Sequence, residues 1–277
     1  MSYLGFTGIM SAYCSMIKDP WVLEIGVDKG QTALPLLHNL TSFGQSFKWI
    51  GVDVRIDGCV AEQLHHMGGV LPFQGTADEV IQEEIAPLAA WNTAYIHHNS
   101  LDALPLFAEK GWKFDLVLID GDHNYATVIK ELAYLKALTH PSSLIFVDDY
   151  CSSWKDKDLY YKDRSTHSDN DMLDKPEPIP GKVGVNQAVD DWIQENPDWD
   201  CTSLIDCALV RRKDLYIGIG EENLPGVWAQ PLHISLPEIW HNRLIPQAAA
   251  AIAPQEAPQT AITISPPSIV FRQHRRA

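Results

Sequence analysis

The sequence predicts a doubly wound α/β fold with a mainly parallel sheet of seven strands. Short apolar segments alternate with segments of helical spacing along residues 20–213. A glycine-containing turn follows the first apolar segment, and acidic residues end several later ones. The alternation stops after residue 213. We therefore expect one domain over residues 1–213 and an irregular C-terminal extension over residues 214–277.

Composition narrows the class of protein. With 277 residues and 45% hydrophobic content, the chain can bury one sizeable core. A net charge of −15 argues against a nucleic-acid partner, because phosphates are bound through Lys and Arg. The five cysteines are odd in number and lack C-x-x-C spacing, which favours a reducing cytoplasm over a disulfide framework. We expect no membrane association, since no apolar run approaches about 20 residues and no secretory signal pattern is present.

A candidate nucleotide cradle follows the first predicted strand. Residues 21–25 are apolar except for Glu24, as in a buried parallel strand. Gly26 and Gly30 then flank a turn that leads into a predicted helix over residues 31–40. Glycines let the backbone approach a ligand, and a helix N-terminus offers unpaired N–H groups. The third glycine of the dinucleotide fingerprint is missing, which disfavours a dehydrogenase, and a simple chain reversal is the competing interpretation.

Asp53 ends the second predicted strand, residues 47–53. An acid at this point is well placed to accept hydrogen bonds from ribose hydroxyls. The alternative is that its carboxylate only caps the turn before the next helix. The cradle upstream favours the ribose interpretation.

Residues before the central stretch carry weaker signals. We expect helices and strands over residues 1–19 (helix), 60–67 (helix), 70–73 (strand), 78–90 (acidic helix), 94–98 (strand) and 101–110 (helix). His65 and His66 have no acidic or Cys partner at metal-binding spacing, so we assign them to the surface. Ser100 is expected either to hydrogen-bond the adenine side of a nucleoside or to cap the helix that follows it.

The stretch from residue 114 to residue 150 gives the strongest local signal. Residues 115–120 predict a buried strand, and the following residues predict a helix with its apolar positions on one face. Asp122 is the expected N-cap of that helix. A second apolar strand ends at Asp148.

Four polar side chains fall where these two strands end: Asp120, His123, Asp148 and Asp149. Because open α/β sheets bind ligands at the carboxyl ends of their strands, we expect the four to converge. Three carboxylates suit Mg²⁺ or Mn²⁺, and an imidazole suits a general base. Taken singly, each of the four also suits a capping role. A Gly-Asp-His run occurs in metallophosphoesterases too, but those need further His and Asp clusters that this sequence lacks.

Residues 151–182 interrupt the pattern directly after the acidic strand end. They are charged and aromatic, with prolines near their end. Long loops in this position often bind substrate or cover a site, so we expect a lid-like insertion, with a plain surface loop as the alternative. A helix over residues 184–195 and a last, antiparallel strand over residues 204–210 complete the domain. Residues 246–277 are expected to be disordered because they begin with an Ala-, Pro- and Gln-rich stretch.

The motifs carry a family resemblance. The glycine turn after strand one and the acid after strand two resemble the class I S-adenosylmethionine-dependent methyltransferases, which have a Rossmann-like fold. The block from Asp115 to Tyr125 is more specific. With its Ile-Asp-Gly-Asp-His run and downstream acidic pair, it resembles the metal-dependent macrocin- and mycinamicin-type O-methyltransferases. Residues 184–192 resemble a helix of those enzymes, and the resemblance extends over residues 20–213.

This resemblance implies a role for each matching residue. Asp120, Asp148 and Asp149 match the Mg²⁺ ligands. His123 matches the general base, a position that holds Lys in catechol-type enzymes. Contacts to S-adenosylmethionine are implied for the residues that match the cofactor motifs, namely Glu24, Gly26, Gly30, Thr32, Asp53 and Ser100.

The features together predict an S-adenosylmethionine-dependent O-methyltransferase that uses Mg²⁺ and acts on a hydroxyl of a small molecule, such as a sugar or natural product. The metal would orient the acceptor and stabilise alkoxide character while His123 takes the proton. Three alternatives stay open: a catalytically silent cofactor-binding partner subunit, an oxidative component of the cephalosporin-hydroxylase type, and a docking role for residues 214–277. The acceptor and any homo-oligomer are left undetermined.

Overall fold

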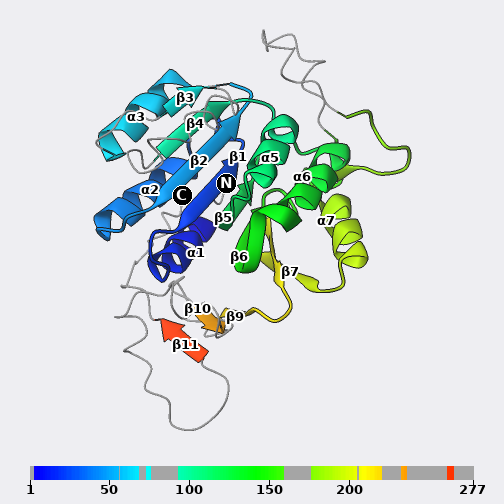
Figure 1. The fold of residues 1–277 in the computed structure, drawn as a ribbon. Helices are drawn as coiled ribbons and strands as arrows, with labels where there is room; N and C mark the ends of the chain where they lie inside the picture. Colours follow the sequence, from blue (N-terminus) through cyan, green and yellow to red (C-terminus); the bar gives the residue numbers. More distant parts are fainter. Residues whose placement is uncertain are drawn as a thin grey trace, which may run out of the picture.

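The computed structural model describes residues 3–55, 57–68, 73–75, 93–158, 176–204, 206–219, 232–235 and 261–264. Helices and strands alternate through the main domain (Figure 1). In chain order it contains α1 (Tyr3–Ser15), β1 (Trp21–Ile25), α2 (Ala33–Ser42), β2 (Lys48–Asp53), α3 (Gly58–Gly68), β3 (Phe73–Gly75), β4 (Thr93–His97), α5 (Ser100–Glu109), β5 (Phe114–Ile119), α6 (Tyr125–Leu138), β6 (Thr139–Val147), α7 (Gly184–Glu195), β7 (Trp199–Leu204) and β8 (Cys207–Arg212).

The strands form one eight-stranded sheet in the order β3-β4-β2-β1-β5-β6-β8-β7. All neighbouring pairs from β3 to β6 are parallel, and β8 is antiparallel to both β6 and β7. The predicted doubly wound, mainly parallel sheet with an antiparallel last strand is confirmed. Strand order reverses between β1 and β5, so the chain leaves a topological switch point at the carboxyl ends of these two strands.

Helices cover both faces of this sheet (Figure 1). Helices α1, α2 and α3 pack on one face, and α5, α6 and α7 pack on the other. The central strand β5 shows why its sequence is apolar throughout: Leu116 and Leu118 face the first layer, while Val117 and Ile119 face the second. Because both faces are buried, the alternation expected of a half-exposed strand is absent.

The sheet has one strand more than the sequence predicted. Where one strand was expected over residues 204–210, the chain forms the hairpin β7–β8. Strand β7 is at the sheet edge and exposes Thr202 and Ser203, so it presents no continuous apolar run. An ion pair of 3.0 Å between Arg211 of β8 and Asp200 of β7 joins the hairpin. Its sequence signal is therefore weak for a physical reason, since edge strands need to bury only part of one face.

The C-terminal extension is less irregular than predicted. Strands β9 (Tyr216–Ile219), β10 (Leu232–Ser235) and β11 (Ala261–Ile264) form a three-stranded antiparallel sheet. Strand β11 falls within residues 246–277, for which composition predicted disorder. Its Ala-Ile-Thr-Ile sequence favours a strand locally, and the surrounding Ala, Pro and Gln residues mask that signal.

Several predictions fall partly or wholly outside the described residues. These are the acidic helix over residues 78–90, most of the 151–182 insertion and the side chains of His65 and His66. None of the helices in the described part of the chain has both the length and the apolar character needed to cross a bilayer. All five cysteines are free thiols.

Candidate active site

The glycine turn after β1 lies against the end of β5. Gly26 has a φ of +83°, which L side chains rarely adopt. A Cβ atom at Gly26 would lie 2.3 Å from the carbonyl oxygen of Asp120. The Gly26 N–H donates to the Val52 carbonyl at 2.9 Å, and the Asp120 N–H donates to the Ile25 carbonyl at 2.8 Å. The carboxyl ends of β1, β2 and β5 therefore meet at a point where only glycine fits.

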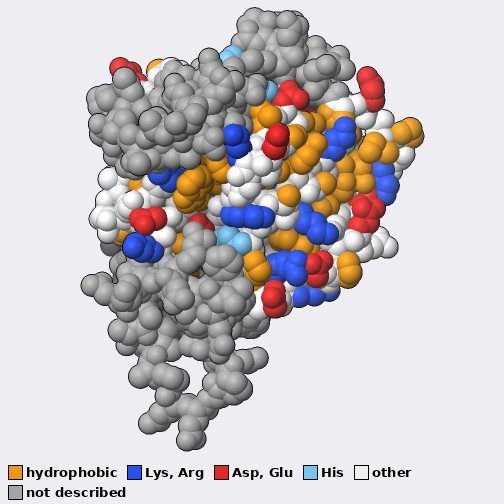
Figure 2. All heavy atoms as spheres, viewed as in Figure 1, with side chains coloured by type: hydrophobic (Ala, Val, Ile, Leu, Met, Phe, Trp, Pro, Cys, Tyr) orange, Lys and Arg blue, Asp and Glu red, His pale blue; other side chains and the backbone are white. Residues whose placement is uncertain are grey.

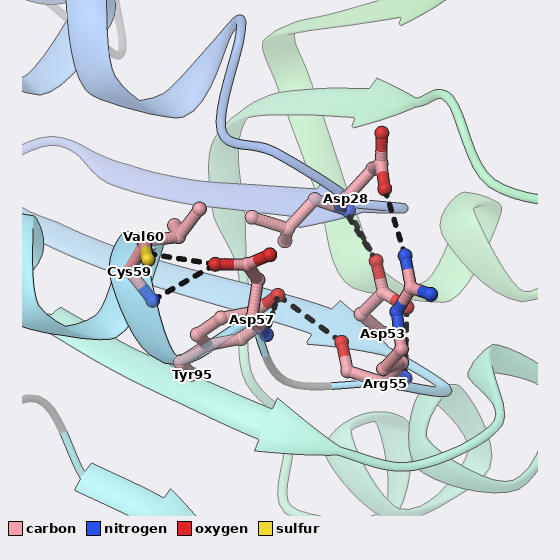
Figure 3. Close-up of polar contacts among 8 residues, drawn as sticks. Asp28, Asp53, Arg55, Asp57, Cys59, Val60 and Tyr95 are labelled. Carbon is pink, nitrogen blue, oxygen red and sulfur yellow. Dashed lines mark hydrogen bonds and ion pairs between the residues drawn. The ribbon is translucent and has the colours of Figure 1, made fainter.

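Asp53 holds this turn in place (Figure 3). Its Oδ2 accepts hydrogen bonds from the N–H groups of Val27 at 2.7 Å and Asp28 at 2.8 Å. Its Oδ1 accepts from the Arg55 N–H at 2.9 Å. The capping alternative is thus realised, and it extends back to the upstream glycine turn. A carboxylate offers about four acceptor positions, so a further bond to a ribose hydroxyl remains compatible with this arrangement.

The loop after β2 is fixed by a second set of contacts (Figure 3). The Arg55 guanidinium pairs with the exposed Asp28 carboxylate at 3.1 Å, so it links the β1 and β2 loops across their mouth. The Tyr95 hydroxyl donates to the Arg55 carbonyl at 3.1 Å. Asp57 accepts from the Cys59 and Val60 N–H groups and caps α3. Sequence reasoning missed Arg55, because a charged residue two positions after a strand end has no distinctive spacing.

Glu24 and Thr32 lie buried beside the turn, each with 2% of its surface exposed. The Trp49 indole N–H donates to Glu24 Oε2 at 3.0 Å, and the Ala33 N–H at the start of α2 also donates to this carboxylate. Burial raises the pKa of Glu24 to about 8, and the nearby Asp120 charge adds to the effect. The hydroxyl of Thr32 is buried and makes no hydrogen bond within the described residues. A buried hydroxyl of this kind suits a ligand that supplies a polar partner.

His123 lies between two of the predicted metal ligands. Its Nδ1 is 2.6 Å from Asp149 Oδ2, and its Nε2 is 3.4 Å from Asp120 Oδ1. Burial lowers the pKa of His123, but the two carboxylates outweigh that effect and raise the pKa to about 10. Asp149 has a φ of +58°, so the backbone adopts a conformation uncommon for a non-glycine residue to bring this carboxylate to the imidazole.

Asp120 is next to Asp148 as well as to His123. Burial raises the pKa of Asp120 to about 7, the imidazole of His123 opposes the rise, and the adjacent Asp148 adds to it. The Asp148 N–H donates to the Ile119 carbonyl at 2.9 Å, which fixes β6 against β5 at this edge. The thiol of Cys207, at the start of β8, donates to Asp148 Oδ1 at 3.2 Å. No sequence signal pointed to Cys207, because its partner is 59 positions away.

The structure therefore brings the four predicted residues together at the switch point. Among the described residues, however, no group of three or more His, Cys, Asp or Glu side chains has a metal-binding arrangement. The imidazole of His123 lies between the carboxylates of Asp120 and Asp149. The predicted metal-binding arrangement of Asp120, Asp148 and Asp149 is therefore not formed in the described part of the chain.

The capping alternative for Ser100 and the predicted Asp122 cap are both wrong. Asn99 caps α5, because its side chain accepts from the Leu101 N–H at 2.9 Å, while the Ser100 hydroxyl donates to Glu131 at 2.6 Å. The N-cap position of α6 is held by Asn124, and Asp122 instead accepts from the Thr127 hydroxyl at 2.5 Å. In both cases an Asn near the expected residue takes the cap position. The adenine contact of Ser100 stays a prediction.

Part of the chain is similar to a family of known proteins. Residues 23–150 match the model of a family described as a methyltransferase domain. This match begins within β1, ends just after the acidic pair that follows β6, and spans less than half of the chain. A search among curated proteins found no match.

Solved structures with a similar fold come from several sources. Cofactor-bound Rv0187 from MTB is 18% identical with a TM-score of 0.47, covering 77% of this chain and 81% of that one. The MycE methyltransferase of the mycinamycin biosynthetic pathway, in complex with Mg, SAH and mycinamycin VI, is 17% identical with a TM-score of 0.45. That match covers 79% of this chain but spans only 51% of the MycE chain. An O-methyltransferase from Bacillus cereus in complex with SAH is 14% identical with a TM-score of 0.44, covering 76% of this chain and 80% of that one.

The close approach at Gly26 predicts a specific response to Gly26→Ala. Gly44 has a similar φ of +66° but open space around the added Cβ, so Gly44→Ala is a matched control. The control should lose about 1–2 kcal/mol from its backbone conformation alone. Gly26→Ala should lose clearly more, because the Asp120 carbonyl must also move. Urea denaturation measures both, and equal losses would contradict the packing described at this turn.

The buried Glu24 predicts a pH-dependent stability. Its pKa is about 8 in the folded chain against 4.5 ordinarily, so the folded state holds the extra proton and loses stability as pH rises from about 4.5 to about 8. Glu24→Gln imitates the protonated form and should become more stable than the wild type, by a margin that grows across this window. Urea midpoints at pH 5, 6.5 and 8 measure the margin, with the exposed Glu62→Gln as control. A margin independent of pH would disprove the raised pKa.

Proposed function

We propose that this protein is a methyltransferase that transfers a methyl group from S-adenosylmethionine to a hydroxyl of a small molecule, a sugar or natural product, with Mg²⁺ or Mn²⁺ as metal. One observation carries the proposal. The backbone of Asp120, which starts the His123 and carboxylate cluster, is in direct contact with the Gly26 turn. A nucleotide cradle and a candidate base are therefore adjacent at one switch point, as methyl transfer between a bound cofactor and an acceptor requires.

The residues around the glycine turn fit the cofactor. S-adenosylmethionine supplies an electrophilic methyl group on a sulfonium. In this proposal Asp53 accepts from ribose, Ser100 lies near the adenine, and the residues at the turn contact the methionine side and the loop face: Glu24, Gly26, Gly30 and Thr32. The buried Thr32 hydroxyl, which makes no hydrogen bond within the described residues, supports this assignment. The acidic surroundings of the turn also suit a positively charged ligand.

The carboxylate edge fits a hard divalent cation. Asp120, Asp148 and Asp149 offer oxygen donors only, which favours Mg²⁺ or Mn²⁺ over zinc. The mutual repulsion of Asp120 and Asp148 supports the presence of a neutralising cation there. Bound metal would supply orientation of the acceptor and stabilisation of its alkoxide character.

His123 is the proposed base. It is held by Asp149 through Nδ1, and its Nε2 makes the longer contact. Nε2 is therefore the nitrogen we assign to the acceptor proton. The two carboxylates that favour the imidazolium are also proposed metal ligands, so neutralising them would leave His123 free to accept a proton.

The proposed partner is a small molecule, and the proposed compartment is the cytoplasm. A small-molecule acceptor, rather than nucleic acid or membrane, suits the net charge of −15 and the mixture of acidic, basic and apolar side chains on the face in Figure 2. The five free thiols suit the cytoplasm. A homo-oligomer is left open.

The metal assignment is tested by Asp148→Asn. We expect calorimetric titration to give S-adenosylmethionine binding in wild type and variant alike, because the cofactor turn is untouched. Mg²⁺ binding to the cofactor-loaded protein should weaken by at least about tenfold in the variant, since one carboxylate ligand loses its charge.

Asp102→Asn, an exposed acid in the first turn of α5, is the control and should bind Mg²⁺ like the wild type. Equal Mg²⁺ affinity in Asp148→Asn would remove the metal assignment. A wild type that binds no S-adenosylmethionine would remove the cofactor assignment as well.

A further inference from the structure

One carboxylate outside the cluster bridges two helix N-termini. Asp158, in the first part of the insertion, is partly buried. Its Oδ1 accepts hydrogen bonds from the backbone N–H groups of Tyr125 at 2.9 Å and Gly184 at 2.8 Å. Tyr125 is the first residue of α6 and Gly184 the first residue of α7. A single oxygen atom thereby joins the two helices to the insertion.

Neither helix provides this contact from its own sequence. The N-cap residues are Asn124 for α6 and Val183 for α7, and neither side chain makes a capping hydrogen bond. The first N–H groups of a helix have no partner within the helix, and negative charge is favourable there. Asp158 supplies a hydrogen-bond acceptor and a negative charge to both helices at once. Because both helices are distant from Asp158 in the sequence, its position depends on tertiary packing and not on a local turn.

The segment that carries Asp158 is tied to the His123 turn at both of its ends. This segment comprises residues 149–158. At its start, the Asp149 carboxylate lies 2.6 Å from His123 Nδ1. At its other end, the Asp158 carboxylate accepts from the N–H of Tyr125, two residues after His123. Between them, a hydrogen bond from the Ser152 N–H to the Asp149 carbonyl and another from the Lys155 N–H to the Ser152 carbonyl continue the turns. The position of Asp149 is therefore linked to the Asp158 contact.

The same segment packs closely against the start of α7. Gly184 has a φ of +77°, and a Cβ there would lie 2.2 Å from the Lys155 carbonyl oxygen. The Asn186 N–H donates to that oxygen at 3.2 Å. The segment is therefore held against the first turn of α7 by two contacts, one through the Lys155 backbone carbonyl and one through the Asp158 side chain.

The returning part of the insertion reaches the same place. Lys182 Nζ is 2.6 Å from Asp191 Oδ2, and the Tyr125 hydroxyl donates to the same oxygen at 2.8 Å. The outgoing part contacts the Tyr125 backbone and the returning part connects to its side chain. Both described arms of the insertion thus converge on the residue two positions after His123.

We propose that Asp158 is a positioning residue for the His123–Asp149 pair, coupling the first part of the insertion to the base of the reaction. The inference rests on the proposed function for the role of His123. Asp158 acts through the N–H of Tyr125 and through the segment that ends in Asp149. It has no assigned contact with the acceptor or the cofactor.

The test is nuclear magnetic resonance of the full chain with Asp158→Ala and, as matched control, Asp156→Ala, which removes an exposed acid from the same segment. The imidazole N–H of His123 that faces Asp149 is the probe, assigned by its absence in His123→Gln. Asp158→Ala should make this proton exchange with water at least about tenfold faster. The factor is that by which affinity or activity typically falls when a contact supporting a functional side chain is removed. Asp158→Asn, which keeps an acceptor oxygen without the charge, should restore part of the protection. Asp156→Ala should change nothing.

A second variant guards against a folding defect. Gly184→Ala displaces Lys155 from α7 while keeping every carboxylate, and Gly181→Ala, with a φ of +75° and open space, is its control. Gly184→Ala should also speed exchange at His123, and Gly181→Ala should not. Wild-type exchange at His123 in Asp158→Ala, together with lost protection of the Tyr125 and Gly184 amides, would reduce Asp158 to a helix cap and overturn the proposal.

The outcome is separable from the proposed function. Titration of S-adenosylmethionine and of Mg²⁺ alone into the same samples tests the function. Exchange at the imidazole needs neither ligand. Failure of ligand binding with faster exchange in Asp158→Ala leaves the positioning contact standing and removes the methyl-transfer role. Normal ligand binding with unchanged exchange in Asp158→Ala leaves the proposed function standing and removes the positioning role of Asp158.

Discussion

The close contact between the glycine turn after β1 and the backbone at the end of β5 is the constraint on which the rest of the site depends. A side chain at Gly26 would overlap the Asp120 carbonyl, so the two strand ends approach as nearly as their backbones allow. Parallel strands on either side of a switch point leave a crevice at their carboxyl ends. Here the crevice begins with a turn built for a ligand on one side and an acidic cluster on the other. The backbone therefore places the proposed cofactor turn and the acidic cluster side by side.

The close approach of the strand ends also brings several carboxylates together, and each of them has a different hydrogen-bond or ionic partner. Burial raises the pKa of Glu24 to about 8, although the N–H donors that it receives from an indole and a helix start oppose the rise. Asp53 is satisfied by backbone N–H groups of the turn. Asp149 faces an imidazole, and Asp148 receives a thiol donor. Buried charges persist only with partners of this kind. An acidic edge of this density favours cationic ligands, which is the common feature of a sulfonium cofactor and a divalent metal.

The insertion after the acidic strand is integrated into this edge rather than appended to it. Its two described arms meet at Tyr125, the outgoing one through Asp158 and the returning one through Lys182 and Asp191. A loop fixed close to a candidate base can influence both the shape of the acceptor site and the orientation of the base. In the proposed function, acceptor choice and proton transfer would therefore depend on the same connected contacts.

The layered fold and the residues at the sheet edge were predictable from the amino-acid sequence, because both depend on local pattern. Strands such as β1 and β5 are apolar since both sheet faces are covered, and acids or glycines fall where such strands end. The partners of those residues were not predictable, because they depend on how the elements pack together. The orientation of His123 between two acids, the binding of the glycine turn by Asp53 and the double cap by Asp158 all join groups from different elements. Strand β7 escaped prediction for a related reason, because an edge strand is stabilised by its neighbour more than by an apolar run of its own. Local spacing records burial and turn chemistry, whereas hydrogen-bond partners are chosen by proximity, which only the folded chain defines.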